Sequence, residues 1–311
     1  MDLFTAEDRR AAVGMSDMSA ILGLSQFDSA ADLWLKYTGR APIADELGPV
    51  TPKRTPGLFF GPRMEPVISQ AFESHMLDEY GRDVKLRRDG RQYEKKEHRT
   101  QCHLDYRIQG EDAGVEAKNP GTLWSGDWGE PMTDQIPEGY LAQVHGQMWH
   151  VDTLNTIYCA RLVGHEFNVY KVDRDERWFD VFAKAVDEFW HYVDNDKAPP
   201  LDYTRRNITE TLALLYPNCD GRVINFGEDE VALTRVLELA QKSRKLAAGG
   251  VDHARAQLRE RMGTASYALM PNGKVWRRYH QPGSTYEVTR EDAVDFRMID
   301  RLPKAVAESI Q

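Results

Sequence analysis

The sequence predicts an α/β fold in which a central sheet is flanked by helices, followed by a C-terminal helical and β-hairpin extension. Segments with helical spacing of apolar residues and segments with strand-like alternation follow one another up to about residue 205, and the pattern changes beyond it. The expected division is therefore 1–205 for the core domain and 206–311 for the extension. The 311 residues are enough for one large domain with an appendage.

The N-terminal part of the core is expected to be helical. A helix should begin at Ser16, a plausible N-cap, and another should cover residues 29–37. Four prolines between residues 41 and 57 predict a long loop. From Pro62 to about Met76, apolar residues recur at the spacing of one buried helical face. Glu65 falls at the edge of that face, where a carboxylate needs a partner.

Two neighbouring segments have the alternation of strands. Residues 99–108 place His103, Asp105 and Arg107 on the face opposite to Cys102, Leu104, Tyr106 and Ile108. Residues 114–119 form a second strand that places Glu116 and Lys118 on one face. If the two strands pair as a hairpin, Asp105, Glu116 and Lys118 lie together.

The second half of the core repeats helix and strand. A helix starting near Pro137 has an apolar stripe, with Gln143 and Gln147 on a different face, and His145 and Gln147 are expected at its surface. Before it, Trp124 and Trp128 either stack on nucleic-acid bases or pack against the domain. The remaining expected elements are strands at 156–163 and 166–172, a helix at 178–193, two helices or one bent helix at 228–262 around Gly249-Gly250, and strands within 265–290 around the turn 271–273.

The candidate chemistry lies in Asp105 and the segment Glu116-Ala117-Lys118. Two carboxylates on strands suit Mg²⁺ or Mn²⁺, which prefer oxygen ligands, and Glu65 could add another. Such a metal can lower the pKa of a water molecule and orient it toward a phosphorus atom. Lys118 could position or deprotonate that water, or stabilise developing charge. The alternative interpretation is an exposed hairpin with a cross-strand ion pair.

Composition limits the possible functions. The net charge of −9 argues against a protein that coats nucleic acid, although an enzyme that holds DNA in one channel can keep an acidic exterior. Basic residues cluster locally, as in Arg9-Arg10 and Arg205-Arg206. Three distant cysteines form neither a disulfide framework nor a CxxC knuckle, which favours a reducing, cytoplasmic setting. No apolar run approaches 18 residues, so no membrane span is expected.

Over roughly residues 8–200 the sequence resembles the YqaJ-like viral recombinases, relatives of phage lambda exonuclease within the PD-(D/E)xK nuclease superfamily. The resemblance rests on blocks in the family's order: GMSDMSAILGLSQFDSAADLWLKYTGR (14–40), FGPRMEP (60–66), LDYR (104–107), GVEAKNP (114–120), IPEGYLAQVHGQMWHV (136–151), and FW followed by PP near 189–200. The first and fifth blocks are the most specific. The resemblance implies a restriction-endonuclease-like core with a mixed central sheet.

The resemblance also implies roles for individual residues. Asp105 and Glu116 would be metal ligands, assisted by the carbonyl of Ala117, with Glu65 as the helical acidic residue and Lys118 as the catalytic lysine. Gln143, in the family's AQV motif, would lie by the DNA end or scissile phosphate.

A 5′-phosphate pocket is implied by the residues around Ser16. Ser16, with Arg9 or Arg10 seven or six residues before it, matches the residues that hold a terminal 5′-phosphate in lambda-type enzymes. A helix N-terminus at Ser16 would independently suit an anion. Two positions depart from the lambda-type pattern: His103 replaces a small hydroxyl residue at the phosphate pocket, and Leu104 replaces the usual proline.

The implied function is Mg²⁺-dependent 5′→3′ digestion of linear double-stranded DNA, leaving 3′ single strands for phage-type recombination, with Mn²⁺ as a substitute. Lambda-type relatives form a ring-shaped trimer and act with a single-strand annealing protein, so the resemblance implies both for this protein. It also implies a location in the cytoplasm of a bacterium or of a phage-infected host cell. The alternatives are another nuclease of the superfamily, either an endonuclease or a single-strand exonuclease, and a non-catalytic protein that binds DNA ends. The iron–sulfur form of the single-strand enzyme needs four cysteines, which this chain lacks.

Overall fold

A computed structural model describes residues 6–43, 46, 48–121, 128–219, 223–272 and 274–277. The chain forms two compact units, Met1–Pro217 and Asn218–Gln311. Helix α7 (Ile208–Leu215) therefore lies in the first unit, past the boundary at 205 that the sequence suggested. It is held to α3 (Ala30–Tyr37) because the Thr211 hydroxyl and the Asn207 amide both donate to the buried carboxylate of Asp32.

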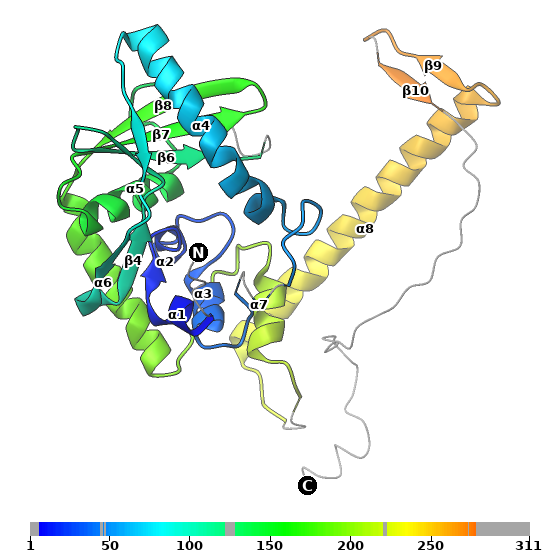
Figure 1. Ribbon diagram of the computed structural model, residues 1–311. Helices are drawn as coiled ribbons and strands as arrows, with labels where there is room; N and C mark the ends of the chain where they lie inside the picture. The colour runs from blue at the N-terminus through cyan, green and yellow to red at the C-terminus, as the bar shows by residue number, and fades with distance from the viewer. Residues whose placement is uncertain are drawn as a thin grey trace. The chain divides into compact units, whose positions relative to one another are not determined.

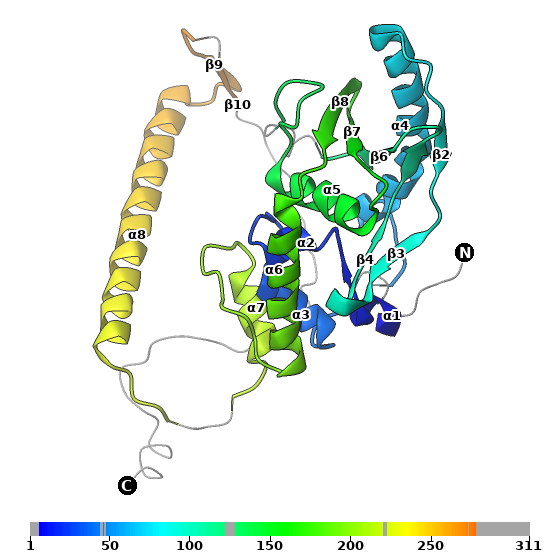
Figure 2. The same cartoon turned by 90° about the vertical axis from the view of Figure 1, so that its left-hand side faces the viewer.

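A mixed sheet forms the centre of the first unit. Its strand order is β2 (Leu86–Arg88), β5 (Tyr106–Ile108), β6 (Ala113–Lys118), β7 (Thr156–Val163) and β8 (Glu166–Asp173). Strands β6 and β7 are parallel and the other neighbours are antiparallel. Figures 1 and 2 show this sheet between α4 (Pro56–Tyr80) on one side and α5 (Glu138–His150) on the other. The predicted α/β architecture with a mixed, helix-flanked sheet is confirmed.

Each face of the sheet has its own hydrophobic core. On one face, Ile68, Phe72 and Met76 of α4 pack against Val115 and Tyr158. On the other face, α5 and α6 (Arg177–Asp194) cover a second core that includes Ile157, Cys159, Tyr170 and Val172 of the sheet. Helix α4 is longer than the expected 62–76 because Pro56 occupies its first turn, where a missing N–H costs nothing.

The expected single strand over 99–108 is wrong. It divides into β4 (Thr100–His103) and β5, which belong to different sheets. Strand β4 pairs with β1 (Val13–Gly14) and β3 (Gln92–Lys95), whereas β5 pairs with β2 and β6. Burial alternates through the break, but Cys102 and Leu104 enter one core and Tyr106 and Ile108 the other.

The N-terminal helices differ in detail from expectation. The first are α1 (Ala6–Ala11) and the four-residue α2 (Met18–Ile21), whose N-cap is Asp17 rather than Ser16. A turn over residues 14–17 precedes α2, so Ser16 lies outside the helix. Helix α3 lies within the expected range 29–37 and begins at a capping box formed by Ser29 and Asp32. A short 3₁₀ helix, η2 (Lys96–His98), connects β3 to β4.

The described part of the second unit contains one long helix and a hairpin. Helix α8 runs without interruption from Glu228 to Met262, so the expected interruption at Gly249-Gly250 is wrong. Strands β9 (Tyr267–Leu269) and β10 (Val275–Arg277) pair antiparallel, as expected from the turn between them, and the rest of the expected strand region, 278–290, lies outside the described residues. Among the helices that the structure describes, none has the length and apolar character needed to cross a membrane.

Candidate active site

Asp105 lies at the break between the small sheet and the central sheet. Its Oδ2 accepts a hydrogen bond of 2.8 Å from the backbone N–H of Ala117. Strands β5 and β6 form the predicted hairpin, in which Tyr106 lies opposite Val115. One position further along each strand, this pairing brings Asp105 next to Glu116. The break therefore places the Asp105 carboxylate beside Glu116 of the neighbouring strand.

Glu116 is buried and is held by three side-chain donors. Its Oε1 accepts hydrogen bonds from Lys118 Nζ at 2.7 Å and from Gln143 Nε2 at 2.8 Å. Its Oε2 accepts one from Gln147 Nε2 at 2.7 Å. The residue is only 5 % exposed, so these bonds replace most of its hydration. The carboxylate is thereby fixed in one orientation.

Lys118 completes a closed network with Glu116 and Gln143. Its ammonium donates to Gln143 Oε1 at 2.8 Å as well as to Glu116, and it lies 4.8 Å from the centre of the Tyr140 ring. Burial lowers the pKa of the Lys118 ammonium, but the carboxylates of Glu116 and Asp105 outweigh burial and raise it. The predicted placement of Glu116 and Lys118 on one strand face is what brings both to α5.

The electrostatics of the site favour additional positive charge. Burial raises the pKa of the Asp105 carboxyl well above its usual range, and the Glu116 carboxylate raises it further. The Lys118 ammonium and the N–H of Ala117 oppose this shift without cancelling it. The carboxyl groups of Asp105 and Glu116 lie close together, and the single positive charge of Lys118 does not neutralise two negative charges.

Glu65 approaches the same charges from α4. Its side chain is 18 % exposed, at the edge of the buried face as expected, and Arg88 donates to its Oε2 at 3.1 Å. Burial raises the pKa of Glu65; Arg88 lowers it, and Glu116 and Lys118 contribute in opposite directions. Glu65 therefore belongs to the electrostatic environment of the network, although its hydrogen bond goes to Arg88.

One cavity of about 290 Å³ brings most of the candidate residues together. Asp105, Glu116 and Gln143 line it, and so does Gln147. The residues expected at a 5′-phosphate reach the same cavity: Arg9, Ser16 and His103. The N-terminal segment and the strand break thus converge on a single space.

Arg10 and the capping role of Ser16 do not fit the expectation. The Arg10 guanidinium donates to both carboxylate oxygens of Glu46 and to the carbonyl of Lys36, which ties it to the α3 region away from the cavity. Ser16 lines the cavity as an exposed turn residue, and α2 is too short to provide an anion site at its N-terminus. Of the two arginines, Arg9 is the candidate for the phosphate.

Gln147 is the residue that sequence reasoning missed. Expected at the helix surface with His145, it is 2 % exposed, and His145 is buried against the Trp178 ring. Besides Glu116, Gln147 Nε2 donates to the carbonyl of His103 at 3.0 Å, and its Oε1 has no hydrogen-bond partner among the residues that the structure describes. The signal was its four-residue spacing from Gln143, which places both amides on the same face of α5.

The donor set suits a hard divalent cation. Among the described residues, no three His, Cys, Asp or Glu side chains converge as a complete ligand set. Mg²⁺ is commonly held by one or two carboxylates with water and substrate phosphate oxygens completing its shell. Asp105 and Glu116 fit that pattern, since a cation beside them would offset the burial and the repulsion by Glu116 that together raise the pKa of Asp105.

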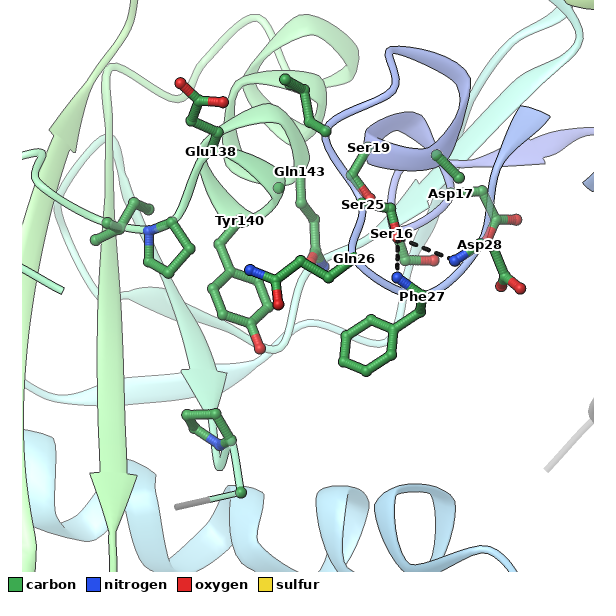
Figure 3. A pocket seen from close by; sticks show the side chains of 17 residues that line it. Ser16, Asp17, Ser19, Ser25, Gln26, Phe27, Asp28, Glu138, Tyr140 and Gln143 are labelled. Carbon is green, nitrogen blue, oxygen red and sulfur yellow. Dashed lines mark hydrogen bonds between the residues drawn. The ribbon is translucent and has the colours of Figure 1, made fainter. Parts of the chain in front are cut away.

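A second, larger pocket of about 620 Å³ adjoins the first and shares Ser16 and Gln143 with it. Figure 3 shows the Tyr140 ring, Gln26 and Phe27 around it. Trp128 packs against the Tyr140 and Tyr170 rings, which supports packing over base stacking for this residue. Trp124 lies outside the described residues.

The chain that forms this site is similar to known proteins. Residues 6–153 match the YqaJ-like viral recombinase domain. The match includes Asp105, Glu116, Lys118 and both glutamines of α5. The resemblance inferred from the motifs is therefore confirmed for this part of the chain.

Individual proteins are also similar to this chain. The chain is 29 % identical over 215 residues to the uncharacterized protein YqaJ of Bacillus subtilis (strain 168), covering 66 % of this chain and 62 % of that protein. An alkaline exonuclease (LHK-Exo) of Laribacter hongkongensis is similar in structure, with 13 % identity, a TM-score of 0.43, and coverage of 60 % of this chain and 90 % of that one. A phage-related exonuclease of Haemophilus somnus 129PT has 16 % identity, a TM-score of 0.39, and coverage of 59 % and 94 %.

Proposed function

We propose that this protein is a Mg²⁺-dependent exonuclease that digests linear double-stranded DNA from 5′ to 3′ and leaves 3′ single strands for recombination. The observation that carries the proposal is that Asp105, Glu116 and Gln143 line one cavity, while Lys118 donates hydrogen bonds to both Glu116 and Gln143. Two carboxylates and a lysine in one buried network form a set suited to phosphodiester hydrolysis. The domain match over residues 6–153 supports the same conclusion.

In the proposed mechanism, Asp105 and Glu116 hold the cation, with the Ala117 carbonyl and Glu65 as further candidate ligands. A bound divalent cation supplies a water of lowered pKa and neutralises charge on the phosphate. Lys118 donates hydrogen bonds toward the attacking water or the developing negative charge. Gln143 bonds both Lys118 and Glu116, and so fixes their separation before the DNA arrives.

The 5′-to-3′ direction of digestion is attributed to Arg9, Ser16 and His103, which line the same cavity. Arg9 would pair with a terminal 5′-phosphate, with Ser16 and His103 as hydrogen-bonding neighbours. A site that recognises the end in this way cannot use a substrate without ends. Arg10 is not included, because Glu46 and Lys36 already satisfy its guanidinium.

The experiment compares linear and covalently closed duplex DNA, with and without Mg²⁺ and with Mn²⁺ as a substitute. The linear substrate carries either 5′-phosphate or 5′-hydroxyl ends. Digestion only of linear DNA, only with metal, and faster from 5′-phosphate ends would support the proposal. Cutting of the closed circle would point to an endonuclease, and a lack of cutting on every DNA would point to a protein that only binds DNA ends.

By resemblance we also propose that the first unit assembles as a ring-shaped trimer and that a single-strand annealing protein receives the 3′ strand. A ring would keep the enzyme on one duplex through many cleavage steps. The mass of the complex on DNA and co-purification with an annealing protein are the corresponding measurements.

A further inference from the structure

Helix α8 exposes an apolar face along its whole length. At 1.5 Å per residue its 35 residues span about 52 Å, and none of them is buried. Its large apolar side chains include Leu233, which is 68 % exposed, and Leu237, which is 53 % exposed. Most helices are stabilised by packing of an apolar face, so an apolar face of this length indicates an interaction surface.

Leu233, Leu237, Val251 and Leu258 follow a heptad repeat together with three alanines, whereas Val231, Val236, Leu239 and Leu246 lie off it. From Glu230 onward, alternating steps of three and four residues mark out one stripe along the helix. We call this stripe the α8 seam. This spacing averages 3.5 residues and is the repeat of left-handed coiled coils. The seam consists of Glu230, Leu233, Leu237, Ala240, Arg244, Ala247, Val251, Ala254, Leu258 and Arg261.

The α8 seam is complementary to itself in the antiparallel direction. When Glu230 of one helix is placed opposite Arg261 of another, opposite charges meet at both ends of the pair. Each layer between the ends then combines a large with a small side chain, apart from the layer of two leucines, and each layer occurs twice because the pair is symmetric. These layers are Leu233 with Leu258, Leu237 with Ala254, Ala240 with Val251, and Arg244 with Ala247.

A parallel pair has the opposite properties. Each seam residue would face its own copy, so Glu230, Arg244 and Arg261 would each meet a like charge. Three layers would contain two alanines each and would leave space unfilled. Antiparallel helices also oppose their macrodipoles, and they bring the acidic first turn at residues 228–230 to the basic last turn of the partner.

We propose that α8 pairs with α8 of a second copy of this chain as an antiparallel coiled coil in this register. The proposal rests on α8 alone and is independent of the activity of the first unit. Arg244, the one charged residue between the two ends of the seam, faces the small Ala247, which leaves room for its side chain to reach water. A polar seam residue of this kind selects one register at some cost in stability.

The first test is the mass of the full chain in solution, measured by sedimentation equilibrium over a range of concentrations. Leu237→Asp places a charge in the seam and should halve the mass of the assembly, whatever the first unit forms. Leu239→Asp is the matched control: Leu239 is 64 % exposed and lies off the seam, so its mass should equal that of the wild type. An unchanged mass for Leu237→Asp, or an equal fall for Leu239→Asp, would overturn the proposal.

The second test fixes the orientation and does not depend on a disruptive variant. In a Cys219→Ser background, which removes the exposed native thiol, one copy carries Leu233→Cys and another carries Leu258→Cys. The antiparallel register predicts a disulfide between the two different copies and none between like copies. Cross-links between like copies would show a parallel pair, and a complete absence of cross-links would show that α8 does not pair in this register; either result refutes the proposal.

Exchanging the charges of Glu230 and Arg261 tests whether these two residues meet at the ends of the antiparallel pair. Glu230→Arg should weaken association, and Glu230→Arg with Arg261→Glu should restore the wild-type mass. Failure of the double variant to recover association would contradict the assigned register.

Discussion

The replacement of Gln147 by leucine tests how the buried carboxylate is held. Gln147 Nε2 donates to Glu116 Oε2 at 2.7 Å and to the His103 carbonyl at 3.0 Å, and the residue is 2 % exposed. A hydrogen bond to a charged group contributes about 1.5–3 kcal/mol and a neutral one about 0.5–1.5 kcal/mol. Leucine recovers part of this sum because it is apolar and because Gln147 Oε1 has no partner to lose.

The expected net loss is about 2 kcal/mol in the free energy of unfolding, or roughly a thirty-fold fall in the folding equilibrium constant. Urea unfolding followed by tryptophan fluorescence suits the measurement, since only Trp276 among the tryptophans lies in the second unit. The matched control is Gln70→Leu on the exposed side of α4, which should change the free energy by less than about 0.5 kcal/mol. Equal effects of the two substitutions would refute the assigned role of Gln147.

Three further predictions concern the cavity and its surroundings. Gln143→Leu should lower the cleavage rate about 100-fold with DNA binding retained, since Lys118 loses one of the two hydrogen-bond partners that position it. Arg9→Ala should weaken use of 5′-phosphate ends by about 10- to 100-fold with little effect on 5′-hydroxyl ends, whereas Arg10→Ala should lower only stability, by about 1 kcal/mol. Asp89→Asn should cost about 2 kcal/mol at pH 7, because hydrogen bonds from Arg91 lower the pKa of Asp89 to about 2.

Each of these has a clear contrary result. Equal loss on both kinds of DNA end for Arg9→Ala would remove it from the phosphate site, and selective loss for Arg10→Ala would place that residue there instead. For Asp89, the folded pKa lies below the unfolded one, so its stabilisation is full above about pH 4 and is lost as the pH falls toward 2. Urea unfolding should therefore show a difference between wild type and Asp89→Asn that shrinks on acidification; a constant difference would contradict the assignment.

The alternation of strand residues was sufficient to predict part of the site. Because side chains on a strand alternate between faces, Glu116 and Lys118 had to share a face, and the hairpin brings Asp105 to them. The break between β4 and β5 was not predictable in the same way. The alternation of buried residues continues through it, and only the hydrogen-bonding partners show that the two strands belong to different sheets.

Partners distant in sequence account for the other differences. Helical spacing placed Gln143 and Gln147 on one face, but it could not show that this face meets the buried carboxylate of Glu116. The ion pair of Arg10 with Glu46 joins residues 36 positions apart, and no local pattern distinguishes Arg10 from Arg9.

The continuity of α8 through Gly249 and Gly250 shows that two glycines weaken a helix without ending it.

The most direct test of the central claim is Mg²⁺-dependent digestion of linear duplex DNA by the wild type and by Lys118→Met, with DNA binding measured in parallel. Methionine keeps most of the length of the lysine side chain and removes its charge. We predict digestion by the wild type, and binding without digestion by the variant. Full digestion by Lys118→Met would contradict the assignment of Asp105, Glu116, Lys118 and Gln143 as one catalytic network.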